Sequence, residues 1–378
     1  SSTSPQDLHP VTGWQNMMIA ARNDPDTAPG FHDKMLIRWG HLITPSAEAR
    51  RIQRAFDKLV QRHDSLRLCF KRDPSGRWRA CIPERHPTGL QIETIGDVDD
   101  AEFVKIVNDR ARVPIDVIDD PLFQMVLMKF GDRGDVLLTR AHHAVLDGYG
   151  AVLLVEELFK TFLNLPLETR AISHSEFVRF QQMQLKKNLS KKDAYWATEL
   201  LPVGAGPNIG RMRKGKPPVD GPMVRDTLRL DNLADPSELA TLETRASALR
   251  QSMFTVLFTA FADVLCDLAD VDTLDVATVV GRTDPILSGF VGSSSSLMVV
   301  RYQRKTADSF EDKAIRTGDK LRTGVEHLPW RGHVGDGVVA DAFAKQNRQV
   351  LQFLVHIPSS KGRSRSSSIS QTLSAGAN

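Results

Sequence analysis

Hydrophobic and polar residues recur with two different periods along the first half of the chain, which predicts helices and strands in turn. Residues 48–63 repeat apolar side chains at helical spacing, after a helix start expected at Thr44-Pro45. In residues 65–82 apolar and polar side chains alternate on both sides of a turn, as in a β-hairpin. Arg67 occupies a polar position there, so we expect its side chain to point away from the hairpin's apolar face. The helical repeat consists of Ile52, Ala55, Phe56, Leu59 and Val60.

Two apolar strands and a helix are predicted next. Residues 119–130 contain few polar side chains, so we expect a central strand covered on both faces. Residues 135–143 form the following strand, and the stretch RAHHAVLDGYG at 140–150 ends it. The adjacent His142 and His143 therefore lie at a strand end, on a loop that leads into a helix, where α/β proteins often place their chemistry. The apolar stripe expected on that helix consists of Ala151, Val155, Leu158, Phe159 and Phe162.

A stretch rich in glycine and proline divides the chain into two halves, each with helices and strands. We expect an N-terminal lobe at residues 1–200, a linker at 201–223 and a C-terminal lobe at 224–357. The Ser-rich residues 358–378 are expected to be disordered. The fold class predicted from this pattern is α/β, with two lobes.

Composition excludes several classes of protein. The chain has 378 residues, is 41% hydrophobic and 25% charged, and has a net charge of +3, which fits a globular protein that does not bind nucleic acid. Its three cysteines form no close pair, which is typical of a reducing compartment. The N-terminus does not resemble a signal peptide, and the apolar residues 253–268 are too few to span a bilayer. We therefore expect a cytoplasmic protein without a membrane segment, and the missing initiator methionine indicates processing or excision from a longer chain.

The paired histidines have three interpretations. As metal ligands they are poor, because neighbouring side chains on a strand point to opposite faces, and no metal site is expected. If the histidines are purely structural, Asp147-Gly148 is an N-cap and turn. This interpretation does not explain why two histidines stand side by side just before that turn. As catalytic residues they make sense, since a neutral imidazole can take a proton from an amine or hydroxyl that attacks a carbonyl. Asp147 would then hold the loop through an arginine, and Gly148 would let the backbone pass close by.

Residues 142–148, HHAVLDG, match the HHxxxDG motif of nonribosomal peptide synthetase condensation domains, in the chloramphenicol acetyltransferase-like superfamily of CoA-dependent acyltransferases. Other stretches resemble the family's motifs in the same order and extend the likeness over residues 5–356. QRHDSLRLCF places Arg62 and Arg67 on the family's two arginines, and VGSSSSLMVVR keeps the spacing of VGxFVNTLxxR. Weaker matches are HSEFVRF, AYWATELL, GVEHLPW and QNRQVLQFLV.

The resemblance implies two acyltransferase-like lobes in a V-shaped pseudo-dimer with a central tunnel. A donor acyl group would enter on the phosphopantetheine arm of an acyl or peptidyl carrier protein, or on CoA, and a small amine or alcohol would accept it. No cofactor is expected to be bound. His143 would be the base or a positioning residue, and His142 would support its loop. Asp147 would form a salt bridge with Arg67, with Arg282 as a second partner.

Departures from the family pattern leave alternatives open. Ser294, Ser295 and Ser296 stand where the family has Phe-Val-Asn, so this substrate-binding segment is expected to differ. Adenylation and carrier-protein motifs are absent, which predicts a monomer or one part of a larger synthetase. The main expectation is a condensation enzyme that forms an amide or ester. The alternatives are a stand-alone acyl-CoA-dependent N- or O-acyltransferase and a catalytically idle platform that recruits other proteins.

Overall fold

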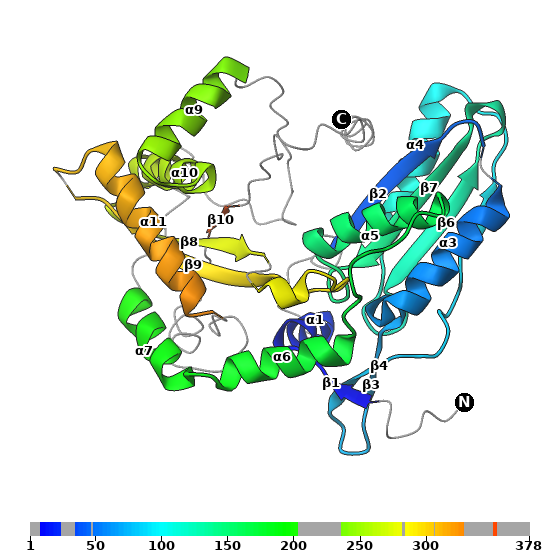
Figure 1. The fold of residues 1–378 in the computed structure, drawn as a ribbon, viewed down its shortest axis with the longest axis horizontal. Coiled ribbons are helices and arrows are strands. Elements are labelled where there is room, and N and C mark those ends of the chain that lie inside the picture. Colours follow the sequence, from blue (N-terminus) through cyan, green and yellow to red (C-terminus); the bar gives the residue numbers. More distant parts are fainter. Residues whose placement is uncertain are drawn as a thin grey trace. The chain divides into compact units, whose positions relative to one another are not determined.

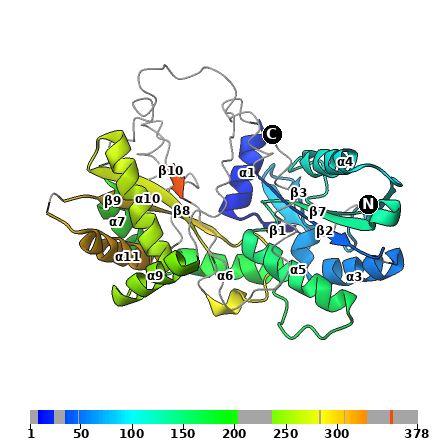
Figure 2. The ribbon, with the colours of Figure 1, turned by 90° about the horizontal axis from the view of Figure 1, so that it is seen from above.

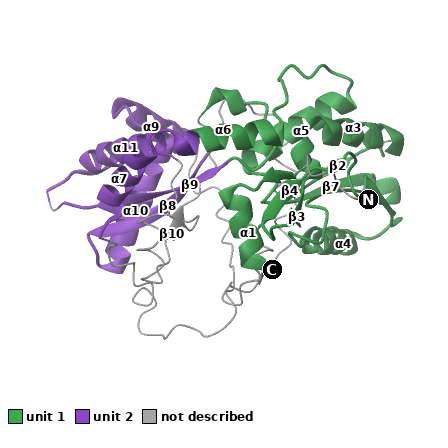
Figure 3. Cartoon of the chain, turned by 90° about the horizontal axis from the view of Figure 1, so that it is seen from below, with its two compact units in different colours: residues 1–183, 284–294, 359–378 green, residues 184–283, 295–358 purple. Residues whose placement is uncertain are grey.

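The structure is a computed structural model. It describes residues 8–23, 35–46, 48–202, 236–281, 284–305 and 307–328, together with a strand at 351–353. These residues fall into two compact units (Figure 3). The first contains the described residues up to Met183 and the segment Asp284–Ser294, and the second contains those from Gln184 to Gly281 and from Ser295 onward.

The first unit is built around a four-stranded sheet in the order β2-β7-β6-β5 (Figure 1). β5 runs parallel to β6, and the other neighbouring strands are antiparallel. Leu36 of β2 lies opposite His142 of β7, and Ile43 lies opposite Asp135. The strands are β2 (Leu36–Ile43), β5 (Gln91–Thr94), β6 (Phe123–Lys129) and β7 (Asp135–His142).

Helices cover both faces of this sheet (Figure 1). Met125 and Leu127 of β6 pack with apolar residues of α3 (Ala49–Arg62) and α5 (Gly148–Phe162) on one face. Val126 and Met128 pack with Val107 of α4 (Asp100–Arg112) on the other. This confirms the central strand predicted within residues 119–130, since alternate side chains of one strand point to opposite faces.

A small three-stranded sheet adjoins a helix near the N-terminus of this unit. The strands β1 (Leu8–Pro10), β4 (Trp78–Cys81) and β3 (Cys69–Arg72) are antiparallel in that order, and α1 (Gly13–Asn23) follows β1 (Figure 2). β3 and β4 confirm the predicted hairpin. Its first strand is shorter than expected, because Asp64–Arg67 form a 3₁₀ turn, η2. A second 3₁₀ turn, η3 (Gly131–Arg133), links β6 to β7.

Two details of the predicted helices are wrong. α3 begins at Ala49, five residues after Thr44, although all five predicted apolar residues are buried. On α5 the buried face is rotated from the predicted stripe, because Leu154 and Glu157 are buried while Phe159 is 42% exposed. The carboxylate of Glu157 reaches the interior because Arg62 and His63 bind it there, as described below, and an apolar pattern does not reveal these partners.

The second unit packs helices against another three-stranded sheet, in the order β10-β8-β9 (Figure 2). Its core joins Trp196, Phe258 and Leu321 from three different helices to residues of β8 and β9. Arg301 of β9 forms a buried ion pair with Asp275 of β8, with 2.7 Å between Nε and Oδ1. The elements are α7 (Leu189–Leu200), α9 (Pro236–Ala248), α10 (Met253–Ala269), β8 (Thr273–Val280), β9 (Ser296–Gln303), α11 (Phe310–Glu326) and β10 (Leu351–Phe353).

The boundaries of the two units differ from those predicted from the sequence. The division falls within α6 (His174–Lys186), so α7 belongs to the second unit although residues 1–200 were expected to form one lobe. The segment Asp284–Ser294, with the 3₁₀ turn η4 (Pro285–Leu287), joins the first unit because Leu287 and Phe290 pack on Phe177 and Ile172. Most of the predicted linker and the tail at 358–378 lie outside the described residues.

In the described part of the chain, no single helix is long and apolar enough to cross a membrane. The helices at Ser237–Ala248 and Met253–Ala269 meet that criterion only when they are counted together, and they are bent by 98°.

Candidate active site

His142 and His143 lie where the sequence predicts, at the end of β7. His142 is fully buried, and its backbone N–H donates to the carbonyl of Leu122 at 2.8 Å. Its Nδ1 accepts a hydrogen bond from the backbone N–H of Ala144 at 3.1 Å. The Nδ1 of His142 therefore carries no proton, and the ring holds the first turn of the loop in place.

His143 differs because its side chain is only partly buried. Its backbone N–H donates to the carbonyl of Met35 at 2.6 Å, which ties it to the start of β2. Its Nδ1 is buried and has no hydrogen-bond partner among the described residues, whereas Nε2 is not among the buried unpaired atoms. Nε2 forms no hydrogen bond with a described residue, so we expect it to be the nitrogen that faces a substrate.

Helix α1 holds the His143 loop from the other side. The indole Nε1 of Trp14 donates to the carbonyl of His143 at 3.1 Å, and the two rings meet edge to face with centroids 5.4 Å apart. The side-chain amide of Gln15 donates to the carbonyl of Ala144 at 3.2 Å. Gln15 is fixed in turn by reciprocal hydrogen bonds with Thr12, as in a capping box. The first turn of α1 therefore donates hydrogen bonds to two consecutive carbonyls of the loop, those of His143 and Ala144.

Asp147 fixes the other end of the loop and is fully buried. As the N-cap of α5, its Oδ1 accepts from the backbone N–H of Gly150 at 2.7 Å. Its Oδ2 accepts from the backbone N–H of Ser294 at 2.7 Å and from the Ser294 hydroxyl at 2.9 Å. The backbone N–H of Asp147 also donates to the carbonyl of Gly292 at 3.1 Å. This carboxylate thereby joins the histidine loop to the segment Asp284–Ser294.

The prediction that Asp147 forms an ion pair with Arg67 is wrong. Nη1 of Arg67 donates to the carbonyls of Pro83 and Glu84, both at 2.6 Å, and Arg67 forms no ion pair with a described residue. Because the 3₁₀ turn η2 replaces the predicted start of the strand, the guanidinium is directed to the chain after β4. Arg67 supports the hairpin instead. Arg282, the other predicted partner of Asp147, lies outside the described residues.

Arg62 belongs to a separate buried cluster under α5. Its Nε donates to Glu157 at 3.0 Å, and Nε2 of His63 lies 2.6 Å from the same carboxylate. Arg62 also donates to the carbonyl of Thr169. Burial raises the pKa of the Glu157 carboxyl, but the hydrogen bonds from His63 and Arg62 outweigh it and leave the pKa below its usual value. The cluster fastens α3 to α5 and supports the scaffold of the loop.

Other predicted residues have different surroundings from those expected. The close backbone approach assigned to Gly148 occurs at Gly150, where a Cβ would lie 2.9 Å from the carbonyl oxygen of Gly292, whereas a Cβ on Gly148 would meet nothing within 4 Å. Ser294 binds Asp147, and Ser296 begins β9. A substrate-binding role for Ser294, Ser295 and Ser296 stays a prediction. Among the described residues, no group of three or more His, Cys, Asp or Glu side chains could hold a metal ion.

Sequence reasoning missed α1 and its contacts with the loop. The run Thr12-Gly13-Trp14-Gln15 has the spacing of a capping box, and this signal could have placed a helix start there. Nothing in the sequence pattern shows that Trp14 and Gln15 contact a loop about 130 residues away, since both are 129 positions from their acceptors.

Known proteins identify the family of the chain. The model of one family, the condensation domain, matches residues 7–329. The chain is 26% identical over 304 residues to one of the plipastatin synthase proteins of Bacillus subtilis (strain 168), an alignment that covers 76% of this chain and 8% of that protein. The chain thus spans less than a tenth of the length of this curated relative.

Solved structures show the same fold. The condensation domain of the monacolin K polyketide synthase MokA superposes with a TM-score of 0.70 at 16% identity, covering 91% of this chain and 77% of that one. SgcC5 of Streptomyces globisporus superposes with a TM-score of 0.70 at 21% identity, covering 93% of this chain and 82% of that one. The chain belongs to the condensation domain family, and its mixed helix and sheet fold is the chloramphenicol acetyltransferase-like fold of that family.

Proposed function

We propose that this chain transfers an acyl group from the phosphopantetheine thioester of a carrier protein to an amine or hydroxyl, with His143 as the base. The observation that carries the proposal is the state of His143. Its backbone is held by Met35 and Trp14, while the Nε2 of its partly exposed ring has no hydrogen-bond partner among the described residues. A general base needs this combination of a fixed position and an open nitrogen.

In the proposed reaction, Nε2 of His143 takes a proton from the acceptor amine as its nitrogen attacks the thioester carbonyl. The C–N bond forms and the C–S bond breaks. The leaving thiolate then receives the proton from the imidazolium, so the enzyme ends as it began. Since the sequence contains no GxSxG nucleophile motif, the acyl group passes directly between substrates.

In this proposal, Asp147 and α1 position the loop that carries His143. Asp147 fixes the loop after His143 to Gly150 and Ser294, and Trp14 and Gln15 fix the carbonyls of His143 and Ala144. Small displacements of a catalytic group can cost large factors in rate, which explains why so many contacts converge on this loop. The carrier protein is proposed as the partner, either as a separate chain or as part of a larger synthetase.

Intact-mass spectrometry tests the proposal. Carrier proteins loaded with aminoacyl or fatty acyl thioesters are incubated with this protein and a panel of amines and alcohols. We expect loss of the acyl mass from the carrier and appearance of the amide or ester only when the protein is present. Transfer from acyl-CoA but from none of the carriers would contradict the carrier as donor. Absence of any transfer would contradict the enzymatic role and favour a recruitment platform.

A further inference from the structure

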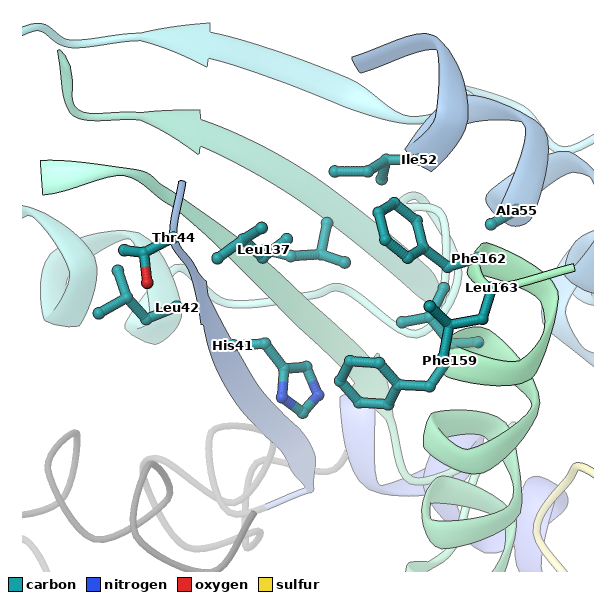
Figure 4. A pocket seen from close by; sticks show the side chains of 11 residues that line it. His41, Leu42, Thr44, Ile52, Ala55, Leu137, Phe159, Phe162 and Leu163 are labelled. Atoms are coloured by element: carbon teal, nitrogen blue, oxygen red, sulfur yellow. The ribbon is translucent and has the colours of Figure 1, made fainter. Parts of the chain in front are cut away.

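A pocket of about 340 Å³ lies between β2, α3 and the end of α5 in the first unit (Figure 4). It is distant from His143. Along β7 the pocket residue Leu137 precedes His142 by five residues, about 17 Å of strand. Along α5 the pocket residue Phe159 is eleven residues from Gly148, about 17 Å of helix. The pocket is therefore separate from the site at the histidine loop.

The wall of this pocket is uncharged. It is lined by His41, Leu42, Ile43, Thr44, Ile52, Ala55, Leu137, Leu158, Phe159, Phe162 and Leu163. Only His41 and Thr44 have polar side-chain atoms. Burial lowers the pKa of His41, so its ring is neutral at neutral pH. A nearby cation, Arg51, already stacks on Phe162 with 4.5 Å from its Cζ to the ring centroid and donates to the Phe162 carbonyl.

The pocket is a crevice with a buried floor and an exposed rim. Ile52 and Ala55 of the floor are each 1% exposed, whereas Leu163 at the rim is 57% exposed and Phe159 42% exposed. The volume lies within the range of small-molecule sites, which begins near 300 Å³. Apolar area that a ligand removes from water stabilises its complex, so this wall favours a narrow apolar guest over a charged one.

His41 adds one polar feature to the wall. Its ring lies edge-on to Phe159 with centroids 5.1 Å apart, beside the crevice (Figure 4). Its Nε2 is buried within the wall, and neither ring nitrogen forms a hydrogen bond with a described residue. The hydroxyl of Thr44 lies on the same strand side of the pocket (Figure 4). A guest with one hydroxyl can therefore bury its chain against the apolar wall and place that hydroxyl beside the hydroxyl of Thr44.

We propose that this crevice binds a small uncharged molecule with an aliphatic chain and a single hydroxyl, of the class of medium-chain alcohols. The proposal is independent of acyl transfer at His143. It rests on the volume, the apolar and uncharged wall, and the hydroxyl of Thr44 at the strand side of the pocket.

Methyl NMR of the full chain, labelled at Ile and Leu, tests the site with 1-octanol as the probe. We expect saturable shifts of the Ile43, Ile52 and Leu158 methyls and none at Leu274, a buried core residue of the second unit. Octanoate and octylammonium have the same chain with a charge, which is costly to bury, and should bind at least ~10-fold more weakly. Unmoved pocket methyls at millimolar octanol, or equal binding of either charged analogue, would overturn the proposal.

A pair of rim variants distinguishes this site from general apolar partitioning. Leu163→Arg places a charge at the rim, and Leu165→Arg places the same charge at a residue that is 52% exposed and does not line the pocket. Both positions are exposed, so both variants should fold, which an unchanged methyl signal of Ile115, a buried residue of the first unit outside the pocket, verifies. We expect Leu163→Arg to weaken octanol binding at least ~10-fold and Leu165→Arg to change it less than ~2-fold. Equal effects of the two variants would contradict the assigned site.

Discussion

Asp147 has more hydrogen bonds than helix capping requires. Its two oxygens accept from Gly150 and from both donors of Ser294, and it is fully buried. Asp147→Ala leaves these donors without an acceptor, so we expect a loss of about 3 kcal/mol in the free energy of unfolding. Asp147→Asn retains one acceptor and should fall in between. Urea unfolding of the two variants measures both losses.

Variants of the serine segment provide the control for Asp147. Ser294→Ala removes the hydroxyl and keeps the backbone donor, and should cost about 1 kcal/mol. Ser293→Ala is the matched control, because Ser293 has no hydrogen bond to Asp147, and should cost almost nothing. In the Asp147→Ala background, Ser294→Ala should cost less than it does alone. Strictly additive losses would contradict the observed hydrogen bond.

His174 makes stability depend on pH. Burial lowers its pKa to about 3, from an ordinary value of 6.5. Between these values the unfolded chain binds a proton that the folded chain does not, so stability decreases as the pH falls below 6.5. From pH 7 to pH 5 this residue should remove about 2 kcal/mol from the free energy of unfolding. His174→Phe should abolish that part of the loss. Equal losses in urea unfolding of wild type and variant would show that His174 is not buried as a neutral ring.

Some single residues could be predicted from the sequence and others could not. The positions of His142, His143 and Asp147 at a strand end and helix start follow from a local pattern, and the structure has them there. The partner of Asp147 depends on which atoms reach it after the chain folds. A single 3₁₀ turn redirects Arg67, and a serine from far along the chain binds the carboxylate instead.

At the scale of elements, α1 is predicted to contribute to turnover by positioning. Trp14→Ala removes a hydrogen bond to the His143 carbonyl and an edge-to-face ring contact. We expect kcat to fall about 10-fold with little change in the KM for the acyl donor. Trp14→Phe keeps a ring and should lower kcat less.

Trp78→Ala is the matched control for this helix. Trp78 lies on β4, where its ring contacts Arg72 and packs on the same apolar cluster as Trp14, but it forms no hydrogen bond with the histidine loop. We expect this variant to keep kcat within ~2-fold of the wild type. A comparable decrease of kcat in Trp78→Ala and Trp14→Ala would mean that Trp14 acts only through general stability.

Elements with strong periodicity were predictable, and those defined by distant contacts were not. The helix α3 and the strands β6 and β7 follow from their apolar repeats, because burial on one or both faces is a local constraint. The rotation of α5 was missed because Glu157 is buried through its ion pair with Arg62 and its hydrogen bond with His63. The contacts of α1 with the histidine loop could not be predicted because they join residues 129 positions apart, although the spacing of Thr12 and Gln15 marks the start of the helix.

At the scale of the whole molecule, the family and the fold could be predicted from the ordered motifs. Which segments of the chain belong to each of the two units could not. The segment Asp284–Ser294 joins the first unit through Leu287 and Phe290 and through the bonds of Asp147. A linear pattern assigns such a segment to the half of the chain that contains it. The V-shaped arrangement and the tunnel implied by the resemblance stay predictions.

The central claim is that His143 acts as the base in acyl transfer from a carrier thioester. Its most direct test is a single-turnover measurement of product formation from one acyl-carrier protein and one acceptor amine, with wild type and His143→Ala compared at equal concentrations. We expect His143→Ala to lower the rate by ~10²–10⁴, the contribution of a positioned general base, with an unchanged circular dichroism spectrum and melting temperature. A folded His143→Ala variant that forms product at the wild-type rate would contradict the account.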